Sequence, residues 1–396
     1  LFPYTTLFRS DIADAKVVYL DTMPEIQKLK AKVTLLPTSA EISIVSAVCN
    51  NVQATGGSVK FLDFDKDTVW FDANVTLAGK ARDVLQIVDS DPLNVCDDLS
   101  VSCQDVQGDV SGVLQLRFPF DEQLEDKLTF SVKADIENAV LPVPQTEWTF
   151  EEGSLKLSVN NDKLVMNGRG KIENKTAQVD IHQSMTDDTD GVYELKMPMS
   201  PSMIKPYFSN INEFLKGSLL TDMILYPQKD GQILSLDFGL KDAEISLPIG
   251  YVKEFNQKGT LKATIILKND SVQEISSVYL SIPEESIVLK GRVNLPKDKL
   301  FELQLDEIKA PRSDAQLILS VYENGSFDAF VKGEALDIED LLYGNFFENS
   351  TETDFESSTD FTIAAKLDKL YLSQEAPFTQ VDVFVRRYKG HWKDIK

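Results

Sequence analysis

Apolar residues recur at every second position through most of this chain, and this alternation limits the folds that the chain can adopt. The run 29–35 alternates Leu, Ala, Val and Leu with Lys and Thr, and the runs 69–77 and 128–136 repeat the pattern. Because successive side chains of a strand point to opposite faces, period two predicts strands with one apolar and one polar face. Antiparallel sheets tolerate one solvated face, whereas parallel sheets are covered on both. The sequence therefore predicts an all-β, antiparallel fold.

The segments between the alternating runs have the composition of tight turns. The run 315–321 is followed by Asn324-Gly325 and continues at 327–331, and Asn-Gly is a strong hairpin signal because both residues accept positive φ. The spacing predicts about twenty strands, and the absence of a βαβ rhythm excludes doubly wound folds and α/β barrels. So many strands cannot lie flat, so we expect stacked sandwiches, closed barrels or one sheet curled into a trough.

Helical spacing is rare in this sequence. Residues 81–89 carry apolar residues at helical intervals, Ser200-Pro201 has the residues of a helix start, and 337–343 predicts a third short helix. The stretch 345–360 contains the polar, low-complexity part of the chain and predicts a loop or linker. We therefore expect only a few short helices.

The charge and the motifs exclude several function classes. Asp and Glu number 63 against 40 Lys and Arg, a net charge of −23, so phosphate backbones repel the chain and no nucleic-acid partner is expected. His182 and His391 lie far apart, and neither belongs to a triad or a metal motif. Nucleotide-binding loops, zinc-protease motifs and nucleophile elbows are absent. We predict a protein that is not an enzyme and needs no metal or cofactor.

Two cysteines lie close together in the sequence. Cys96 and Cys103 are separated by a polar segment. A disulfide between them would fit an oxidising compartment, and two unbridged thiols fit the spacing as well. Both interpretations stay open.

The first ten residues resemble the in-frame translation of a sequencing-library adapter. We interpret residues 1–10 as an artefact and residues 11–396 as an internal segment that is truncated at both ends. The sequence contains no signal peptide and no transmembrane run. On this interpretation, the missing membrane anchor is a property of the fragment.

Several stretches, taken in order, resemble a known family. They are residues 19–24, 77–93, 106–120, 236–248 and 250–253. Together they are similar to the periplasmic region of the AsmA-like proteins of Gram-negative bacteria, in the YhdP/TamB-related branch. The resemblance extends from Tyr19 to about Leu372 and rests on the order of the motifs.

This resemblance implies an inner-membrane anchor followed by a long antiparallel β-sheet curled into an elongated open groove. The apolar interior of the groove would carry phospholipid acyl chains through the periplasm, between the inner and outer membranes. Carriage of this kind requires a continuous apolar lining and no catalytic residue. The alternative is a structural or adhesive envelope protein of stacked β-sandwiches with closed cores.

The alternating positions supply candidate lining residues for such a groove, although each would equally suit an ordinary sandwich core. The candidates are Val69, Phe71, Val75, Leu128, Phe130, Val132, Leu155, Leu157, Leu234, Leu236, Phe238, Leu261, Ile265, Leu317, Leu319 and Phe327.

Overall fold

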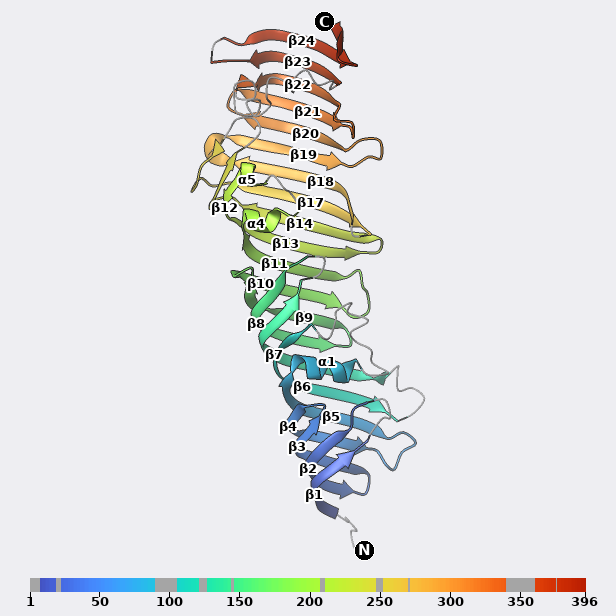
Figure 1. The fold of residues 1–396 in the computed structure, drawn as a ribbon. Coiled ribbons are helices and arrows are strands. Elements are labelled where there is room, and N and C mark those ends of the chain that lie inside the picture. The colour runs from blue at the N-terminus through green and yellow to red at the C-terminus, as the bar shows by residue number, and fades with distance from the viewer. Residues whose placement is uncertain are drawn as a thin grey trace. The chain divides into compact units, whose positions relative to one another are not determined.

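A computed structural model shows that strands dominate the chain (Figure 1). The structure describes residues 8–18, 23–89, 105–120, 127–143, 146–206, 211–246, 252–269, 271–339, 360–374 and 376–396. The chain divides into two compact units, unit 1 (Leu1–Tyr193) and unit 2 (Glu194–Lys396).

Unit 1 is a succession of antiparallel strands that pair in chain order. Each strand from β1 to β10 lies beside the one before it, so the sheet grows by one hairpin at a time. The elements are β1 (Phe8–Val17), β2 (Ile26–Leu36), β3 (Ser39–Cys49), β4 (Val52–Leu62), β5 (Trp70–Lys80), α1 (Ala81–Val88), β6 (Gln107–Pro119), β7 (Thr129–Pro142), β8 (Thr149–Asn160), β9 (Lys163–Ile172) and β10 (Lys175–Ser184). The strand β11 (Gly191–Met199) contains the boundary between the units.

Unit 2 repeats this arrangement and adds a small second sheet. Its long sheet contains β13 (Leu219–Gln228), β14 (Gly231–Gly239), β17 (Thr260–Lys268), β18 (Ser271–Ile282), β19 (Ile287–Asn294), β20 (Phe301–Ala310), β21 (Ser313–Val321), β22 (Phe327–Asp337), β23 (Phe361–Tyr371), β24 (Phe378–Tyr388) and β25 (His391–Ile395). The small sheet contains β12 (Leu215–Gly217), β15 (Ala243–Ser246) and β16 (Val252–Lys253). Short helices accompany them: α4 (Pro201–Ile204), α5 (Ile211–Phe214) and the 3₁₀ turn η1 (Pro283–Glu285).

The predicted fold class is confirmed: the chain is all-β, its long sheet is antiparallel in most pairs, and its helices are few and short. Among the described strands, β1 pairs with β2 and β25 pairs with β24, so each of these strands is an edge and the sheet stays open.

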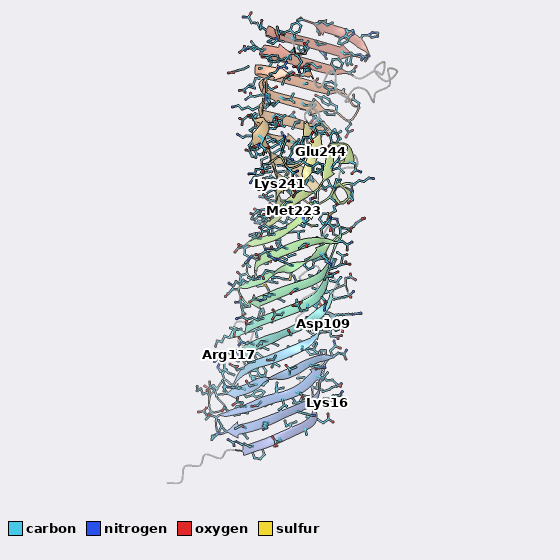
Figure 2. All side chains as sticks on the ribbon, turned by 90° about the vertical axis from the view of Figure 1, so that its left-hand side faces the viewer. Lys16, Asp109, Arg117, Met223, Lys241 and Glu244 are labelled. Atoms are coloured by element: carbon cyan, nitrogen blue, oxygen red, sulfur yellow. The ribbon has the colours of Figure 1, made fainter. Side chains whose placement is uncertain are left out.

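Alternation along each strand gives the sheet two chemically different faces. On the outer face, opposite charges on neighbouring strands meet, as between Asp72 of β5 and Arg117 of β6, at 3.6 Å, and between Asp237 of β14 and Lys262 of β17, at 2.6 Å. Figure 2 places Asp109 and Arg117, both on β6, toward opposite ends of that strand. The polar residues of the alternating pattern therefore form a solvated surface.

A buried phenylalanine ring in unit 1 packs on two glycines. Phe150 of β8 is 3% exposed and lies on Gly153 and Gly170. A Cβ at Gly153 would come within 2.4 Å of the Phe150 ring, and one at Gly170 within 2.5 Å. Only glycine lets the ring approach the backbone so closely.

The pairing of β22 with β23 differs from the expectation, because these two strands run parallel. The other long-sheet pairs of unit 2 between β13 and β25 are antiparallel. A parallel neighbour needs a connection that returns the chain to the starting end of the strand, which a tight turn cannot provide. Residues 338–360 supply the necessary length.

The structure tests some of the remaining local predictions, and others fall outside the described residues. The helix predicted over 81–89 is α1, and the start predicted at Ser200-Pro201 leads into α4. Residues 340–359, which hold most of the predicted 337–343 helix and of the 345–360 loop, lie outside the described part of the chain, as do Cys96 and Cys103. Phe8 to Ser10, assigned above to an adapter, form the start of β1, and their artefactual origin stays a prediction.

Candidate functional site: the apolar face of the sheet

In unit 2, residues on successive strands line up into apolar rows that cross the whole sheet. The central row is defined by the strand register and contains one residue from each of eleven strands. It consists of Leu225, Leu234, Ile265, Ile275, Val293, Leu303, Leu319, Ala329, Ile363, Val385 and Ile395. Because every member is apolar, the row is an unbroken hydrophobic strip.

Two further rows lie beside the central row on the same face, which we call the apolar face of unit 2. One contains Met223, Leu236, Ala263, Val278, Gly291, Leu305, Leu317, Val331, Ala365 and Val383. The other contains Thr221, Phe238, Leu261, Leu280, Leu289, Ile308, Ala315, Gly333, Leu367 and Val381.

Among the residues that the structure describes, no second layer of protein covers the central row. Ten of its eleven side chains are half-buried, Ile395 is exposed, and none is buried. Residues in the core of a closed sandwich would lose almost all their exposure. At about 4.8 Å between strands, the row is about 48 Å long, roughly three times the depth of one bilayer leaflet. The central row is therefore an open strip, longer than a site for one small ligand.

Unit 1 has an apolar face of the same construction. One of its rows contains Ile12, Ala31, Ile44, Gly57, Val75, Leu114, Val132, Val159 and Leu164 and ends at Gln183 of β10. A neighbouring row contains Leu77, Gly112, Ala134, Leu157, Met166 and Ile181. Each unit thus presents an apolar surface of its own.

Aromatic side chains border the apolar face of each unit at one end of the strands. In unit 1 the aromatic edge comprises Phe61, Phe71, Phe118 and Phe120, whose ring centroids lie 4.7 to 6.2 Å apart in stacked and edge contacts. In unit 2 Phe361 stacks on Phe327 at 5.4 Å and meets Trp392 edge-on at 5.8 Å. Such contacts hold large apolar rings in place without burying them fully.

The other end of the apolar face of unit 2 is closed by the small sheet. A buried core forms here from Leu215 of β12, Leu240 between β14 and β15, Ala243 of β15, and Leu280 and Ile282 of β18. Ile204 of α4 and Ile211 of α5 pack against this core. This core closes one edge of the sheet and leaves the central row open.

A fully buried lysine belongs to this small sheet. The Nζ of Lys253 donates hydrogen bonds of 2.8 Å to the carbonyl oxygens of Ala243 and Glu254. Burial lowers the pKa of the Lys253 ammonium, while Glu284 and Asp242 act in the opposite direction. Through these two hydrogen bonds to carbonyl oxygens, Lys253 stabilises the small sheet.

The structure places most predicted lining residues on the apolar faces. Of the unit 1 candidates, Phe71, Val75, Phe130, Val132, Leu155 and Leu157 are register-paired with apolar residues on that face. Of the unit 2 candidates, Leu234, Leu236, Phe238, Leu261, Ile265, Leu317, Leu319 and Phe327 are register-paired there. Their role as a lipid lining stays a prediction.

Several candidates differ from the others in their surroundings: Leu155 is buried, at 1% exposure, and Leu261 packs against the buried core of the small sheet. Val69 and Leu128 come directly before β5 and β7 and lie outside the strands. The carbonyl oxygen of Val69 accepts a hydrogen bond from the Phe120 amide, and that of Leu128 accepts one from the Asn161 side chain. Phe238 packs against the buried core of the small sheet, so it is less available to a ligand than the central row.

The sequence analysis missed both borders of the apolar face. The aromatic edge was detectable, because phenylalanines end or begin several alternating runs, as at Phe118, Phe327 and Phe361. The small sheet was not detectable, because β12, β15 and β16 are too short to show a period.

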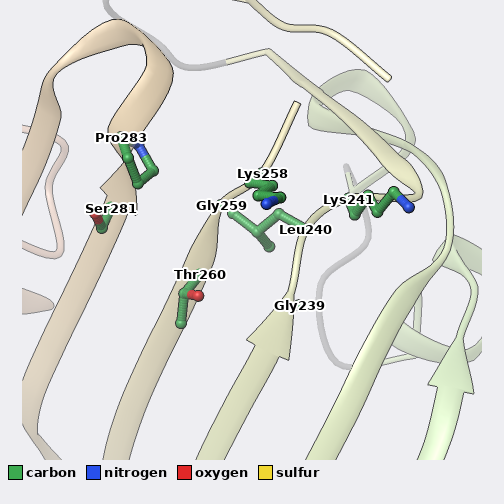
Figure 3. Close-up of a pocket in the computed structure, with 8 residues that line it drawn as sticks. All are labelled: Gly239, Leu240, Lys241, Lys258, Gly259, Thr260, Ser281 and Pro283. Carbon is green, nitrogen blue, oxygen red and sulfur yellow. The ribbon is translucent and has the colours of Figure 1, made fainter. Parts of the chain in front are cut away.

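A shallow hollow outside the central row has a volume of about 290 Å³. It lies where β14, β17 and β18 meet the small sheet, and Figure 3 shows Lys241 pointing away from Thr260 and Ser281, which line it. Among the described residues, no group of three or more His, Cys, Asp or Glu side chains could hold a metal ion. No helix in the described ranges is long and apolar enough to cross a membrane.

A family model described as YhdP protein matches residues 5–393, almost the whole chain. The chain belongs to the YhdP family. Comparisons with curated proteins and with solved structures returned no match. The match spans both units, so both apolar faces lie within the YhdP region of the chain.

Proposed function

We propose that this chain is a segment of a periplasmic protein, anchored in the inner membrane, that carries phospholipids between the inner and outer membranes along its apolar faces. The observation that carries the proposal is the central row of unit 2, eleven apolar side chains in register with none buried. Membership of the YhdP family and the resemblance to AsmA-like proteins support it.

The energetics of acyl chains suit such a strip. Each CH₂ group removed from water contributes about 0.8 kcal/mol, so a lipid tail laid on the row is held firmly. Every strand presents a similar apolar residue, so moving a tail from one strand to the next exchanges one apolar contact for another. Movement along the strip then needs no bond chemistry, which agrees with a protein that is not an enzyme and uses no cofactor.

The proposal is tested by crosslinking from the two faces of one strand. A photoreactive amino acid at Leu319, in the central row, should capture phospholipid in cells. Ile318, the preceding residue, is 40% exposed on the outer face and is the matched control. Phe130 supplies the same test in unit 1, with the neighbouring Ser131 as its outer-face control. Absence of lipid adducts at Leu319 and Phe130, or equal capture at Ile318, would refute the proposal.

A further inference from the structure

One charged side chain lies on the apolar face of unit 2. Along β24, Val381, Val383 and Val385 occupy successive positions on this face, and Arg387 occupies the next one. The strand register places Arg387 opposite Phe361 of β23 and opposite Trp392 of β25. Arg387 therefore stands at the aromatic edge, one position beyond the central row.

Among the described residues, Arg387 has no carboxylate partner of the kind that Arg312 has. Arg312 bonds Asp337 at 3.1 Å and Glu339 at 3.4 Å. The described residues give the half-buried Arg387 guanidinium no ion pair and no hydrogen bond. None of the three rows named above contains a charged residue. A guanidinium on an apolar surface is energetically unfavourable without an anion. The many carboxylates of this acidic chain supply no such anion to Arg387 among the described residues.

Aromatic residues occupy the register positions on both strands beside Arg387. Phe361 lies between Phe327, at 5.4 Å, and Trp392, at 5.8 Å. Trp392 is 59% exposed. Tryptophan favours the boundary between apolar chains and polar headgroups, because its ring is apolar and its N–H is a donor. The site thus combines a cation, a boundary residue and an adjoining apolar strip.

We propose that Arg387 binds the phosphate of a phospholipid headgroup whose acyl chains lie on the central row. The planar guanidinium can donate two parallel hydrogen bonds to phosphate oxygens. The lipid would then lie with its headgroup at the aromatic edge and its tails toward Val385 and Ile363. This inference rests on the proposed function and adds to it an orientation and a named headgroup ligand.

The test compares two adjacent arginines on opposite faces of β24. Arg386 lies opposite Asp394 on the outer face and is the matched control for Arg387. Calorimetric titrations of the chain, of Arg387→Gln and of Arg386→Gln would use short-chain dihexanoylphosphatidylglycerol, dihexanoylglycerol and inorganic phosphate as probes. We expect Arg387→Gln to weaken binding of the phosphatidylglycerol about ten- to a hundredfold, the usual effect of losing a charge-assisted bond. Dihexanoylglycerol, which has no phosphate, should bind all three proteins equally.

The other outcomes contradict the inference in distinguishable ways. If both lipids bind but the two Gln variants behave alike, the headgroup site is wrong and the proposed function survives. If neither lipid binds, the proposed function fails with it. Inorganic phosphate binding as tightly as the phospholipid, and equally dependent on Arg387, would indicate a free-anion site instead. Arg387→Lys, which keeps the charge and loses the planar fork, should bind the phosphatidylglycerol with intermediate affinity, and circular dichroism would verify that every variant is folded.

Discussion

At Lys253 a charged group is fully buried in the small sheet. It is the last residue of β16, and its ammonium donates to the main-chain carbonyl oxygens of Ala243 in β15 and of Glu254, the residue after β16. Burying a charge is unfavourable unless hydrogen bonds replace its water, and these two bonds do so. The stability of the small sheet therefore depends strongly on the hydrogen bonds of this one side chain.

Replacing Lys253 by Met should lower the free energy of unfolding of unit 2 by about 1–3 kcal/mol, because two buried carbonyl groups lose their donor. Urea denaturation followed by circular dichroism measures this change. Lys241→Met, at a lysine that points away from the small pocket, is the control and should have little effect. An unchanged midpoint for Lys253→Met would show that water replaces the lysine.

The same lysine makes a prediction about pH. Its pKa in the folded state is lowered by burial from the ordinary 10.5, so the unfolded chain binds more protons at this group than the folded chain. Stability contributed by Lys253 is then present above 10.5 and is lost as pH falls through the lowered pKa. The loss of stability in Lys253→Met should be greater at about pH 10 than at about pH 7. Denaturation curves at both pH values test the sign.

At the scale of single elements, strand packing depends on glycines at a few close contacts. A Cβ at Gly168 of β9 would lie 2.1 Å from the carbonyl oxygen of Ser154 on β8. Gly56 of β4 has no atom within 4 Å of such a Cβ. We expect Gly168→Ala to destabilise unit 1 by about 1–3 kcal/mol, and Gly56→Ala to change stability by less than about 0.5 kcal/mol. Thermal melts of the two variants would contradict this account if they coincided.

Arg312 joins the turn between β20 and β21 to the ends of the parallel strands. Besides its ion pairs with Asp337 and Glu339, it donates to the Ser373 carbonyl oxygen at 2.8 Å, and its guanidinium lies 4.3 Å from the centre of the Tyr371 ring. Arg312→Ala should cost about 1–3 kcal/mol, because several partners lose their donor together.

Lys309, near the end of β20, is the control for Arg312. Lys309 makes a single exposed ion pair with Glu307 at 3.5 Å, and its replacement by Ala should cost less than about 1 kcal/mol. Hydrogen exchange at the ends of β22 and β23 should accelerate in Arg312→Ala and stay unchanged in Lys309→Ala. Equal exchange in both variants would remove the special role of Arg312.

The sequence was informative about strands and less so about their partners. Alternation identified the hairpin of β21 and β22, because Asn324-Gly325 marks its turn and the apolar positions fix its register. It could not reveal that β22 and β23 are parallel, because strand direction depends on the path of residues 338–360 and leaves no periodic trace. Arg387 continues the alternation of Val381 to Val385 and could have been found by extending that run by one position.

At the scale of the molecule, sequence alone could not distinguish a lining from a core. Leu319 has the same pattern in a sealed sandwich and on an open sheet, and only its half-buried state separates the two. Pattern shows which residues share a face, whereas the presence of a covering layer depends on tertiary structure. The family match shows which family the chain belongs to and does not distinguish a lining from a core.

A charge on the apolar face should disturb lipid passage more than folding. Leu319→Asp puts a carboxylate in the central row, where solvent still reaches it, so we expect the variant to keep its circular dichroism spectrum. Phospholipid recovered with the purified protein should fall severalfold in Leu319→Asp and stay unchanged in Ile318→Asp, the outer-face control. Mass spectrometry of extracted lipid measures both. Unfolding of Leu319→Asp alone would indicate a sealed core.

The parallel pair has a consequence for the order in which unit 2 acquires its structure. Between β17 and β22 each strand can be added to the edge that its predecessor has just formed, so the loops to be closed are short and their entropic cost is low. The addition of β23 must wait until the chain has returned from the end of β22 to the level of its start, because the two strands are parallel. Pulse-labelled hydrogen exchange should find β23 and β24 protected later than β20 and β21, and simultaneous protection would contradict this sequence of events. If strands β17 to β23 assemble in the order of their synthesis, assembly would pause after β22.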